Sequence, residues 1–210
     1  MLGMHTPQAL YSLLPPAGPA RGAGEAHPPA RRLENAASGV SQRFWTCFLA
    51  RDWEALAEIL ADDATVEDRR PVVNYGLMQG RDSVVESLRV GADTGVAHVS
   101  QTTIATRGER LALVHIHFSS HDQRFEAFQS DFIVAVETDT TGRSGANVVY
   151  DVEDFDAAIA ELDSRYRGGE AAAHAQTWSA VASAYTAINR LQMPLMTPDC
   201  VTVDHRGELA

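Results

Sequence analysis

The stretch ADDATVED, at residues 61–68, is the most informative segment of this 210-residue sequence. Its second half, from Ala64 to Asp68, predicts a short strand whose side chains alternate between two faces. Val66 and Asp68 therefore share one face, and Glu67 lies on the other. The segment predicts a strand that ends in a carboxylate on the same side as an apolar residue.

Three helices are expected around this strand. From about Ser41 apolar side chains recur at spacings of three and four, and Asp52 is placed to cap a second helix. The break between these two helices is short, so they should form an open hairpin. Asp82 is placed to cap a third helix after the strand. The apolar positions of the three helices are Phe44, Cys47, Phe48, Trp53, Leu56, Ala57, Leu60, Val84, Val85 and Leu88.

Strand patterns dominate the middle of the chain. In the second of them, residues 111–118, the side chains alternate strictly. Apolar side chains lie on one face, and His115 and His117 lie on the other. Polar connections join the patterns, which favours an antiparallel meander. A last helix, capped by Asp151, follows. Helices first and a meander afterwards predict an α+β domain with helices on one face of a curved sheet. The expected strands cover residues 96–106, 111–118, 125–136 and 147–150.

Composition divides the chain into three parts. Residues 1–38 are rich in Pro, Ala and Gly and are expected to be a disordered tail. Residues 39–168 are expected to form the domain, and residues 169–210 a helix followed by the start of a second, similar unit. Aligned without gaps on residues 62–70, residues 198–206 are identical at three positions. Chance similarity in so short a window is the alternative.

Charge and the absence of lysine exclude several function classes. The net charge of −11 opposes sequence-independent binding to phosphate backbones, so no nucleic-acid partner is expected. The sequence contains no lysine, which excludes a phosphate-binding loop with its lysine, a kinase catalytic lysine and a pyridoxal Schiff base. No cofactor is expected. Abundant Ala and Arg without Lys suggest a GC-rich bacterial genome.

The remaining bulk features indicate a cytoplasmic protein. Cys47 and Cys200 have apolar neighbours and are expected to be buried small apolar residues in a reducing cytoplasm. No apolar run approaches the roughly 18 residues of a membrane span, so no membrane partner is expected. The short apolar patch at residues 9–14 has no basic residues before it, unlike a secretory signal.

The residues around the opening stretch resemble a known family. Phe44, Phe48, Asp52 and residues 61–68 look like the opening of ketosteroid isomerases and of the wider SnoaL-like polyketide cyclase group. These proteins share the nuclear transport factor 2-like cone, with helices on the concave side of a bent antiparallel sheet around an apolar pocket. The resemblance covers roughly residues 41–166. It implies a cone-shaped α+β fold that hosts many functions.

By this resemblance Asp68 falls at the position of the isomerase's catalytic base. A carboxylate in apolar surroundings is a stronger base, which suits it to abstract a proton beside a carbonyl. The alternative is a strand-end aspartate that pairs with Arg69, Arg70 or Arg81. Both interpretations remain open at the level of sequence.

The resemblance also indicates which residues would line the pocket. Isomerase chemistry needs donors for the developing oxyanion, one a tyrosine and one a protonated aspartic acid. Phe44 stands at the tyrosine position and has no hydroxyl. The second donor falls near Asp131, although a register slip of one residue would place Phe132 there instead. The residues expected at the ligand are Phe44, Phe48, Tyr75, Asp131 and Phe132, with Tyr75 offering a hydroxyl.

His115 and His117 form a His-x-His pair, a spacing that can bind a metal. They lie opposite the apolar face of their strand, and the sequence places no acidic or cysteine partner beside them. They are therefore expected to be exposed or at a subunit contact, and no metal site is predicted.

Two functions from different classes fit these observations. The first is a small-molecule-binding module without assured catalysis. Residues 151–166 and the GEAAAHA segment at residues 169–175 resemble the C-terminal tandem units of long actinobacterial regulatory proteins, which implies a sensor or dimerisation element. The second is an isomerase or cyclase for a steroid- or polyketide-like carbonyl compound, with Asp68 as base. The expected partners are a hydrophobic small molecule and a second copy of the chain.

Overall fold

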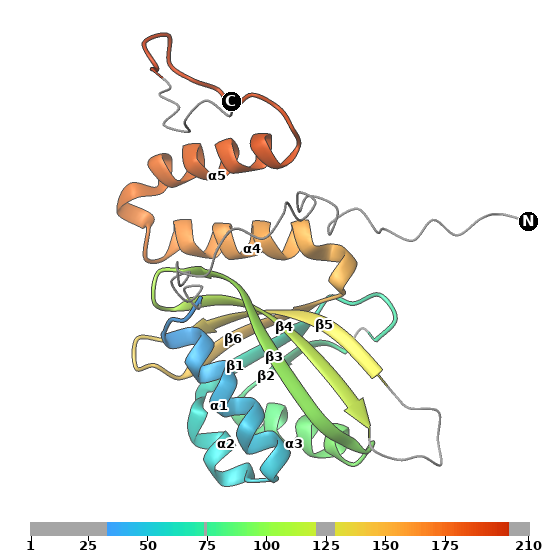
Figure 1. Cartoon of the computed structure of the whole chain (residues 1–210). Helices are drawn as coiled ribbons and strands as arrows, with labels where there is room; N and C mark the ends of the chain where they lie inside the picture. Colours follow the sequence, from blue (N-terminus) through green and yellow to red (C-terminus); the bar gives the residue numbers. More distant parts are fainter. Residues whose placement is uncertain (1–32, 74, 121–128, 202–210) are drawn as a thin grey trace, which may run out of the picture. The chain divides into compact units, whose positions relative to one another are not determined.

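The computed structural model describes residues 33–73, 75–120 and 129–201 (Figure 1). The helices are α1 (Ala36–Ala50), α2 (Trp53–Ile59), α3 (Arg81–Ala92), α4 (Phe155–Gly168) and α5 (Ala175–Asn189), with 3-10 turns η1 (Val152–Asp154) and η2 (Ala172–His174). The strands are β1 (Leu60–Asp68), β2 (Gly76–Gln79), β3 (Val96–Arg107), β4 (Leu111–Ser120), β5 (Gln129–Thr138) and β6 (Ser144–Tyr150).

The six strands form one curved sheet in the order β2-β1-β6-β5-β4-β3. Strands β3 to β6 are consecutive antiparallel neighbours, as the meander prediction requires. β1 pairs parallel with β6 and antiparallel with β2. Helices α1 to α3 pack on the concave face of this sheet, so the predicted cone-shaped α+β fold is confirmed.

α1 begins five residues before the predicted start at Ser41. Asn35 explains the difference, because its side chain accepts a hydrogen bond from the Ser38 backbone N–H while the Ser38 hydroxyl oxygen accepts one from the Asn35 N–H. This reciprocal arrangement is a capping box, which satisfies backbone donors that a helix start leaves open. The Asn35 side chain also donates to carbonyl oxygens of Gly108 and Leu111, which fixes the start of α1 on the β3–β4 turn.

Other local predictions need correction. α3 begins at Arg81 after Gly80, and no side chain caps it, so Asp82 lies inside the first turn. Asp151 precedes the 3-10 turn η1 and does not cap α4. The short edge strand β2 was not predicted, and Cys200, which was expected to be buried, is exposed. The predicted third strand began at residue 125, but residues 121–128 lie outside the described part of the chain.

Alternation along the strands separates two layers of core. On the concave face, Val114 and Ile116 of β4 pack with Phe132 of β5 and with the helices α1 to α3. On the outer face, Leu111 and Leu113 of β4 pack with α4. The buried residues of this outer layer are Leu111, Leu113, Ile133, Ala135, Val148, Tyr150, Ala158 and Leu162.

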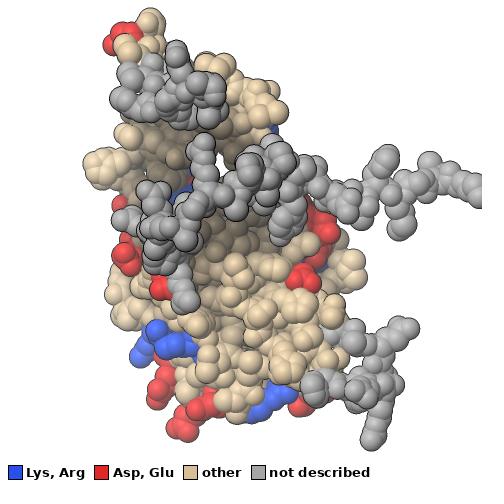
Figure 2. Space-filling view, in the orientation of Figure 1, with Lys and Arg blue, Asp and Glu red and all other residues tan. Residues whose placement is uncertain are grey.

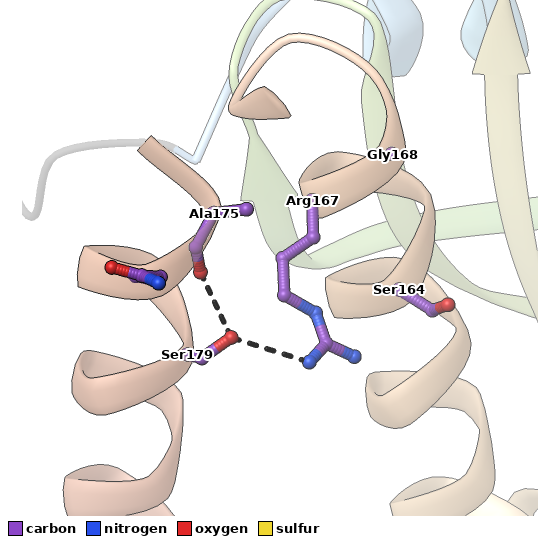
Figure 3. Close-up of a pocket in the computed structure, with 6 residues that line it drawn as sticks. Ser164, Arg167, Gly168, Ala175 and Ser179 are labelled. Atoms are coloured by element: carbon purple, nitrogen blue, oxygen red, sulfur yellow. Dashed lines mark hydrogen bonds between the residues drawn. The ribbon is translucent and has the colours of Figure 1, made fainter. Parts of the chain in front are cut away.

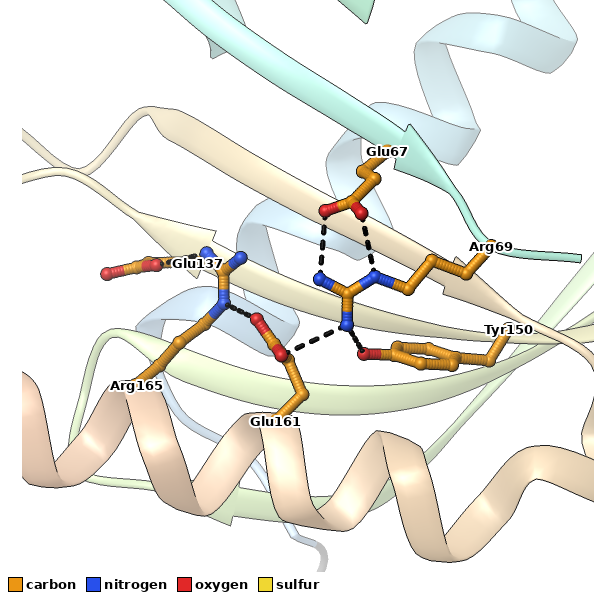
Figure 4. A network of polar contacts seen from close by, with 6 residues as sticks. All are labelled: Glu67, Arg69, Glu137, Tyr150, Glu161 and Arg165. Atoms are coloured by element: carbon orange, nitrogen blue, oxygen red, sulfur yellow. Dashed lines mark hydrogen bonds and ion pairs between the residues drawn. The ribbon is translucent and has the colours of Figure 1, made fainter. Parts of the chain in front are cut away.

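A network of charged side chains ties α4 to the sheet (Figure 4). Arg69, just after β1, donates to both oxygens of Glu67 and also reaches the Tyr150 hydroxyl at 2.7 Å and Glu161 of α4 at 3.1 Å. Arg165 continues the network, donating at 2.7 Å to Glu161 and to Glu137 of β5. The network therefore joins α4 to β1, β6 and β5.

α5 folds back against α4 after η2. The Tyr166 ring of α4 and the Trp178 ring of α5 meet edge to face at 5.0 Å, and the Arg107 guanidinium lies over Trp178. α5 nevertheless has no buried residue. The predicted second strand at residues 198–206 lies largely outside the described residues, so the boundary at residue 168 stays a prediction.

The surface adds two observations. On the face seen in Figure 2, basic side chains lie in small groups beside acidic ones. Among the residues that the structure describes, no helix is both long and apolar enough to cross a membrane.

Replacing Leu162 with Ala should destabilise the protein by about 2–4 kcal/mol, because the side chain is fully buried between α4 and the sheet and its loss leaves a cavity. Urea unfolding followed by circular dichroism measures the change. Leu49→Ala on the outward side of α1 is the matched control and should cost less than about 1 kcal/mol. Equal losses in the two variants would contradict the assigned packing of α4.

The Glu161 network should make stability depend on pH. Burial alone would raise the pKa of Glu161, but hydrogen bonds from Arg165 and Arg69 outweigh burial and hold this pKa below its ordinary value. A lowered folded-state pKa gives stability that is present above the ordinary glutamate pKa and is lost as pH falls through the folded value. Glu161→Gln should therefore cost about 1 kcal/mol at pH 7 and weaken the acid-induced loss of stability.

Unfolding midpoints measured from about pH 7 to about pH 3 test this dependence. Glu86→Gln is the control, because Glu86 forms an exposed ion pair with Arg89 at 3.7 Å. The assignment is wrong if Glu161→Gln and Glu86→Gln follow the same acid profile.

Candidate functional site

Aromatic side chains gather on the concave face of the sheet. The Trp45 ring of α1 meets four other rings edge to face, with centroid distances of 4.9 Å to Phe44, 5.6 Å to Phe48, 5.2 Å to Phe118 and 6.4 Å to Phe132. Edge-to-face contacts are the preferred geometry for aromatic pairs. The cluster thus joins α1 to β4 and β5, and it contains the predicted ligand residues Phe44, Phe48 and Phe132.

Part of this aromatic cluster is accessible. Phe48 and Phe132 are buried, but Trp45 and Phe118 are only half buried although both contact the two core clusters of the concave face. Val66 and Val99 bridge the same two clusters and are also half buried. The concave face therefore keeps an accessible apolar surface between its two clusters.

Trp45 was not among the sequence-based ligand residues. Its spacing of three from Phe48 places both on one side of a helix, and this signal could have identified it. The apolar positions predicted for this helix were Phe44, Cys47 and Phe48, and Trp45, next to Phe44, was not among them. Phe118 was predicted on the correct face of β4 but was not assigned to the pocket.

Asp68 lies on the concave face and is paired with Arg70. The two side chains are 4% and 14% exposed. Oδ1 of Asp68 accepts from the backbone N–H and the Nε–H of Arg70, both at 3.0 Å, and Oδ2 accepts from Nη2 at 2.8 Å. The Arg70 guanidinium lies 5.0 Å from the centre of the Phe132 ring. This is one of the ion pairs that the sequence offered as the alternative for Asp68.

The pairing limits what Asp68 can do as it stands. Both carboxylate oxygens are occupied by a bidentate guanidinium, so proton abstraction requires Arg70 to move away first. A catalytic role for Asp68 stays a prediction. The pair also places one charged side chain of each sign beside the accessible aromatic surface.

The register of β5 separates Asp131 from Phe132. Phe132 pairs with Ile116 of β4 and lies on the concave face, whereas Asp131 pairs with His117 on the outer face. The sequence interpretation named both as ligand residues because its register was open by one position. The structure places only Phe132 with the aromatic cluster, and Asp131 contacts His115 and His117 instead.

Tyr75 lies away from the aromatic cluster's buried members. It follows β1 and precedes β2, and it is 71% exposed. Phe44 has no hydroxyl, so it cannot supply the donor that isomerase chemistry would need. A role for the Tyr75 hydroxyl stays a prediction.

A separate groove of about 490 Å³ lies between α4 and α5 (Figure 3). Nη1 of Arg167 is 3.4 Å from the Ser179 hydroxyl, which itself donates to the Ala175 carbonyl at 2.8 Å. The groove is wide open, so it offers little enclosure to a ligand. It is lined by Ser164, Arg167, Gly168, Ala175, Gln176 and Ser179.

Comparisons with known proteins find likeness at the level of structure only. No family model matches the sequence, and no curated protein matches it. A Mycobacterium tuberculosis protein solved with estradiol-17beta-hemisuccinate is 17% identical, with a TM-score of 0.46 over 56% of this chain and 94% of that one. The Δ5-3-ketosteroid isomerase of a Mycobacterium species is 18% identical, with a TM-score of 0.45 over 58% and 96% of the two chains.

A computationally designed 17-OHP binder is similar to the same degree, with 17% identity and a TM-score of 0.47 over 56% of this chain and 94% of that one. Residues 36–168 form the predicted cone-shaped α+β fold, with helices on the concave face of one curved sheet.

Asp68→Ala should destabilise the protein by about 2–4 kcal/mol, because it leaves the mostly buried Arg70 guanidinium without its partner. Asp62→Ala is the matched control. Asp62 also pairs with an arginine, Arg81, but its side chain is 84% exposed, so its loss should cost less than about 0.5 kcal/mol. Chemical denaturation measures both, and a smaller loss for Asp68→Ala than for Asp62→Ala would refute the buried pair.

Proposed function

We propose that this protein binds a small apolar molecule on the concave face of its sheet. The observation that carries the proposal is the half-buried pair of rings Trp45 and Phe118, which lies between two buried clusters. Ligand sites are typically apolar and aromatic, with a few polar groups that fix orientation. The Asp68–Arg70 pair beside Phe132 offers such polar groups.

Binding without catalysis is the better-supported form of this function. Asp68 accepts three hydrogen bonds from Arg70, Phe44 lacks a hydroxyl, and Asp131 lies on the outer face. A proton abstracted beside a carbonyl leaves an oxyanion, and each missing donor raises the barrier by on the order of 3 kcal/mol. Among the described side chains, the candidate base Asp68 is already paired with Arg70. The residues predicted as hydrogen-bond donors, at positions 44 and 131, do not supply a pair of donors for the oxyanion.

One observation favours the alternative, an isomerase or cyclase for a steroid- or polyketide-like carbonyl compound. Asp68 is on the concave face, on the same side of β1 as Val66, as the resemblance implies. A ligand with an anionic group could draw Arg70 away and free the carboxylate. Catalysis would then depend on a ligand that binds the guanidinium.

We also propose that α5 starts a second unit of the same kind, as in a tandem regulatory protein. α1 and α5 both have 15 residues, and α5 carries no charged residue. Arg51 after α1 and Leu191 after α5 are the two non-glycine residues with positive φ in the described chain. α5 exposes the large apolar side chains of Tyr185 and Ile188 to solvent. Such exposure is expected if the residues that would bury them belong to another unit. The proposed sensor or dimerisation role rests on the resemblance of residues 151–175 to such regulatory proteins.

Estradiol-17beta-hemisuccinate is a suitable first probe, because it combines a rigid apolar body with a carboxylate that Arg70 could meet. At about 100 times its Kd a ligand adds about 2.7 kcal/mol to stability, so the melting temperature should rise by several degrees. Binding should also change the fluorescence of Trp45. Trp45→Phe should remove most of that change, whereas the control Trp178→Phe on α5 should keep it.

The results of these experiments distinguish a ligand site on the concave face from a site at α5, and a binding protein from an enzyme. A fluorescence change that persists in Trp45→Phe and disappears in Trp178→Phe would place the ligand at α5 and overturn the concave site. Proton exchange beside the ketone of a 3-ketosteroid, followed by NMR, tests the alternative. Exchange that wild-type protein accelerates and Asp68→Asn does not would favour the enzyme over the binder.

A further inference from the structure

Three side chains with metal-binding atoms meet on the outer face of the sheet. α4 covers the Leu111 and Leu113 end of β4, and its buried contacts stop there. Further along β4, His115 and His117 lie on the same face but beyond these contacts. With Asp131 of β5 their side chains are 36%, 35% and 42% exposed. The three are therefore open to solvent and to ions.

The strand register brings the three side chains together. His117 lies directly opposite Asp131, and His115 is two residues away on the same face. Nε2 of His115 is 2.9 Å from Oδ1 of Asp131, and Nδ1 of His117 is 3.0 Å from Oδ1 and 3.1 Å from Oδ2. The carboxylate that the sequence could not place beside the histidines thus comes from the neighbouring strand.

These separations are those of hydrogen bonds, and they are close to the spacing between donor atoms around one metal ion. Imidazole nitrogen and carboxylate oxygen bind zinc at about 2.0–2.2 Å, which puts neighbouring donors about 3.0–3.5 Å apart. As they stand, the three side chains are joined by hydrogen bonds, and among the described residues no group of three or more His, Cys, Asp or Glu is arranged to hold a metal ion. An ion would have to replace the shared protons, and exposed side chains can turn to admit it.

We propose that His115, His117 and Asp131 bind one divalent transition-metal ion of the zinc class. Two imidazoles exclude calcium and magnesium, which prefer oxygen ligands, and favour zinc, cobalt, nickel or copper. Water would occupy the remaining coordination positions, as in open zinc sites with three protein ligands. The net charge of −11 raises the local concentration of cations. The inference is independent of any ligand on the concave face.

Calorimetric titration of the full chain, without a histidine tag, with Zn²⁺ tests the site. One ion per chain is expected at this site, and Co²⁺ should give the absorption bands of a nitrogen–oxygen site. His117→Ala and Asp131→Asn should each weaken zinc binding at least about tenfold, since each removes a ligand. Without metal, both variants should unfold within about 0.5 kcal/mol of wild type, because the side chains are exposed.

His174→Ala is the matched control, because His174 belongs to η2 and is exposed. It should leave zinc affinity unchanged. The proposal fails if wild type binds no zinc, if the double variant His115→Ala/His117→Ala binds it as tightly as wild type, or if His174→Ala weakens it as much as His117→Ala.

Discussion

The pairing of β4 with β5 decides what each face of the sheet can do. In this register Ile116 faces Phe132 on the concave side, and His117 faces Asp131 on the outer side. Because side chains alternate strictly along a strand, a slip of one residue would exchange the two sets. The aromatic cluster, the contacts of α4 and the histidine–carboxylate cluster all depend on this one register. Burial of apolar residues on both faces fixes it, since a slipped strand would place Asp131 against Trp45.

Much of the fold could be predicted from the sequence. The alternation from Leu111 to Phe118 and the helical spacing around Phe48 and Leu56 gave the meander and the helices, because burial imposes these periods directly. Helix starts were less predictable. The capping box at Asn35 stabilises a start of α1 that lies before the predicted one at Ser41. α3 begins at Arg81 without a side-chain cap. β2 is only four residues long and half exposed, so its pattern carried little signal.

The candidate site was less predictable because it depends on pairing between distant segments. The sequence offered Arg70 as one of three partners for Asp68, and only the folded chain selects it. It left Asp131 and Phe132 as alternatives for one pocket position, because its register was open by one residue. Trp45 gained its central position from contacts with Phe118 and Phe132, which lie more than seventy positions away along the chain. Local spacing cannot report such contacts.

The parallel pairing of β1 with β6 has a consequence for how the chain folds. β6 is the joint between two parts of the sheet, β2-β1 on one side and β5-β4-β3 on the other. Until residue 150 has been synthesised, β1 and β2 form only a two-stranded ribbon, which is marginally stable alone. The closing contact joins Val66 to Asn147, a large sequence separation that slows folding. During translation β1 and β2 therefore lack their neighbour in the sheet until β6 has been made, and a nascent chain at this stage is most exposed to aggregation and to chaperones.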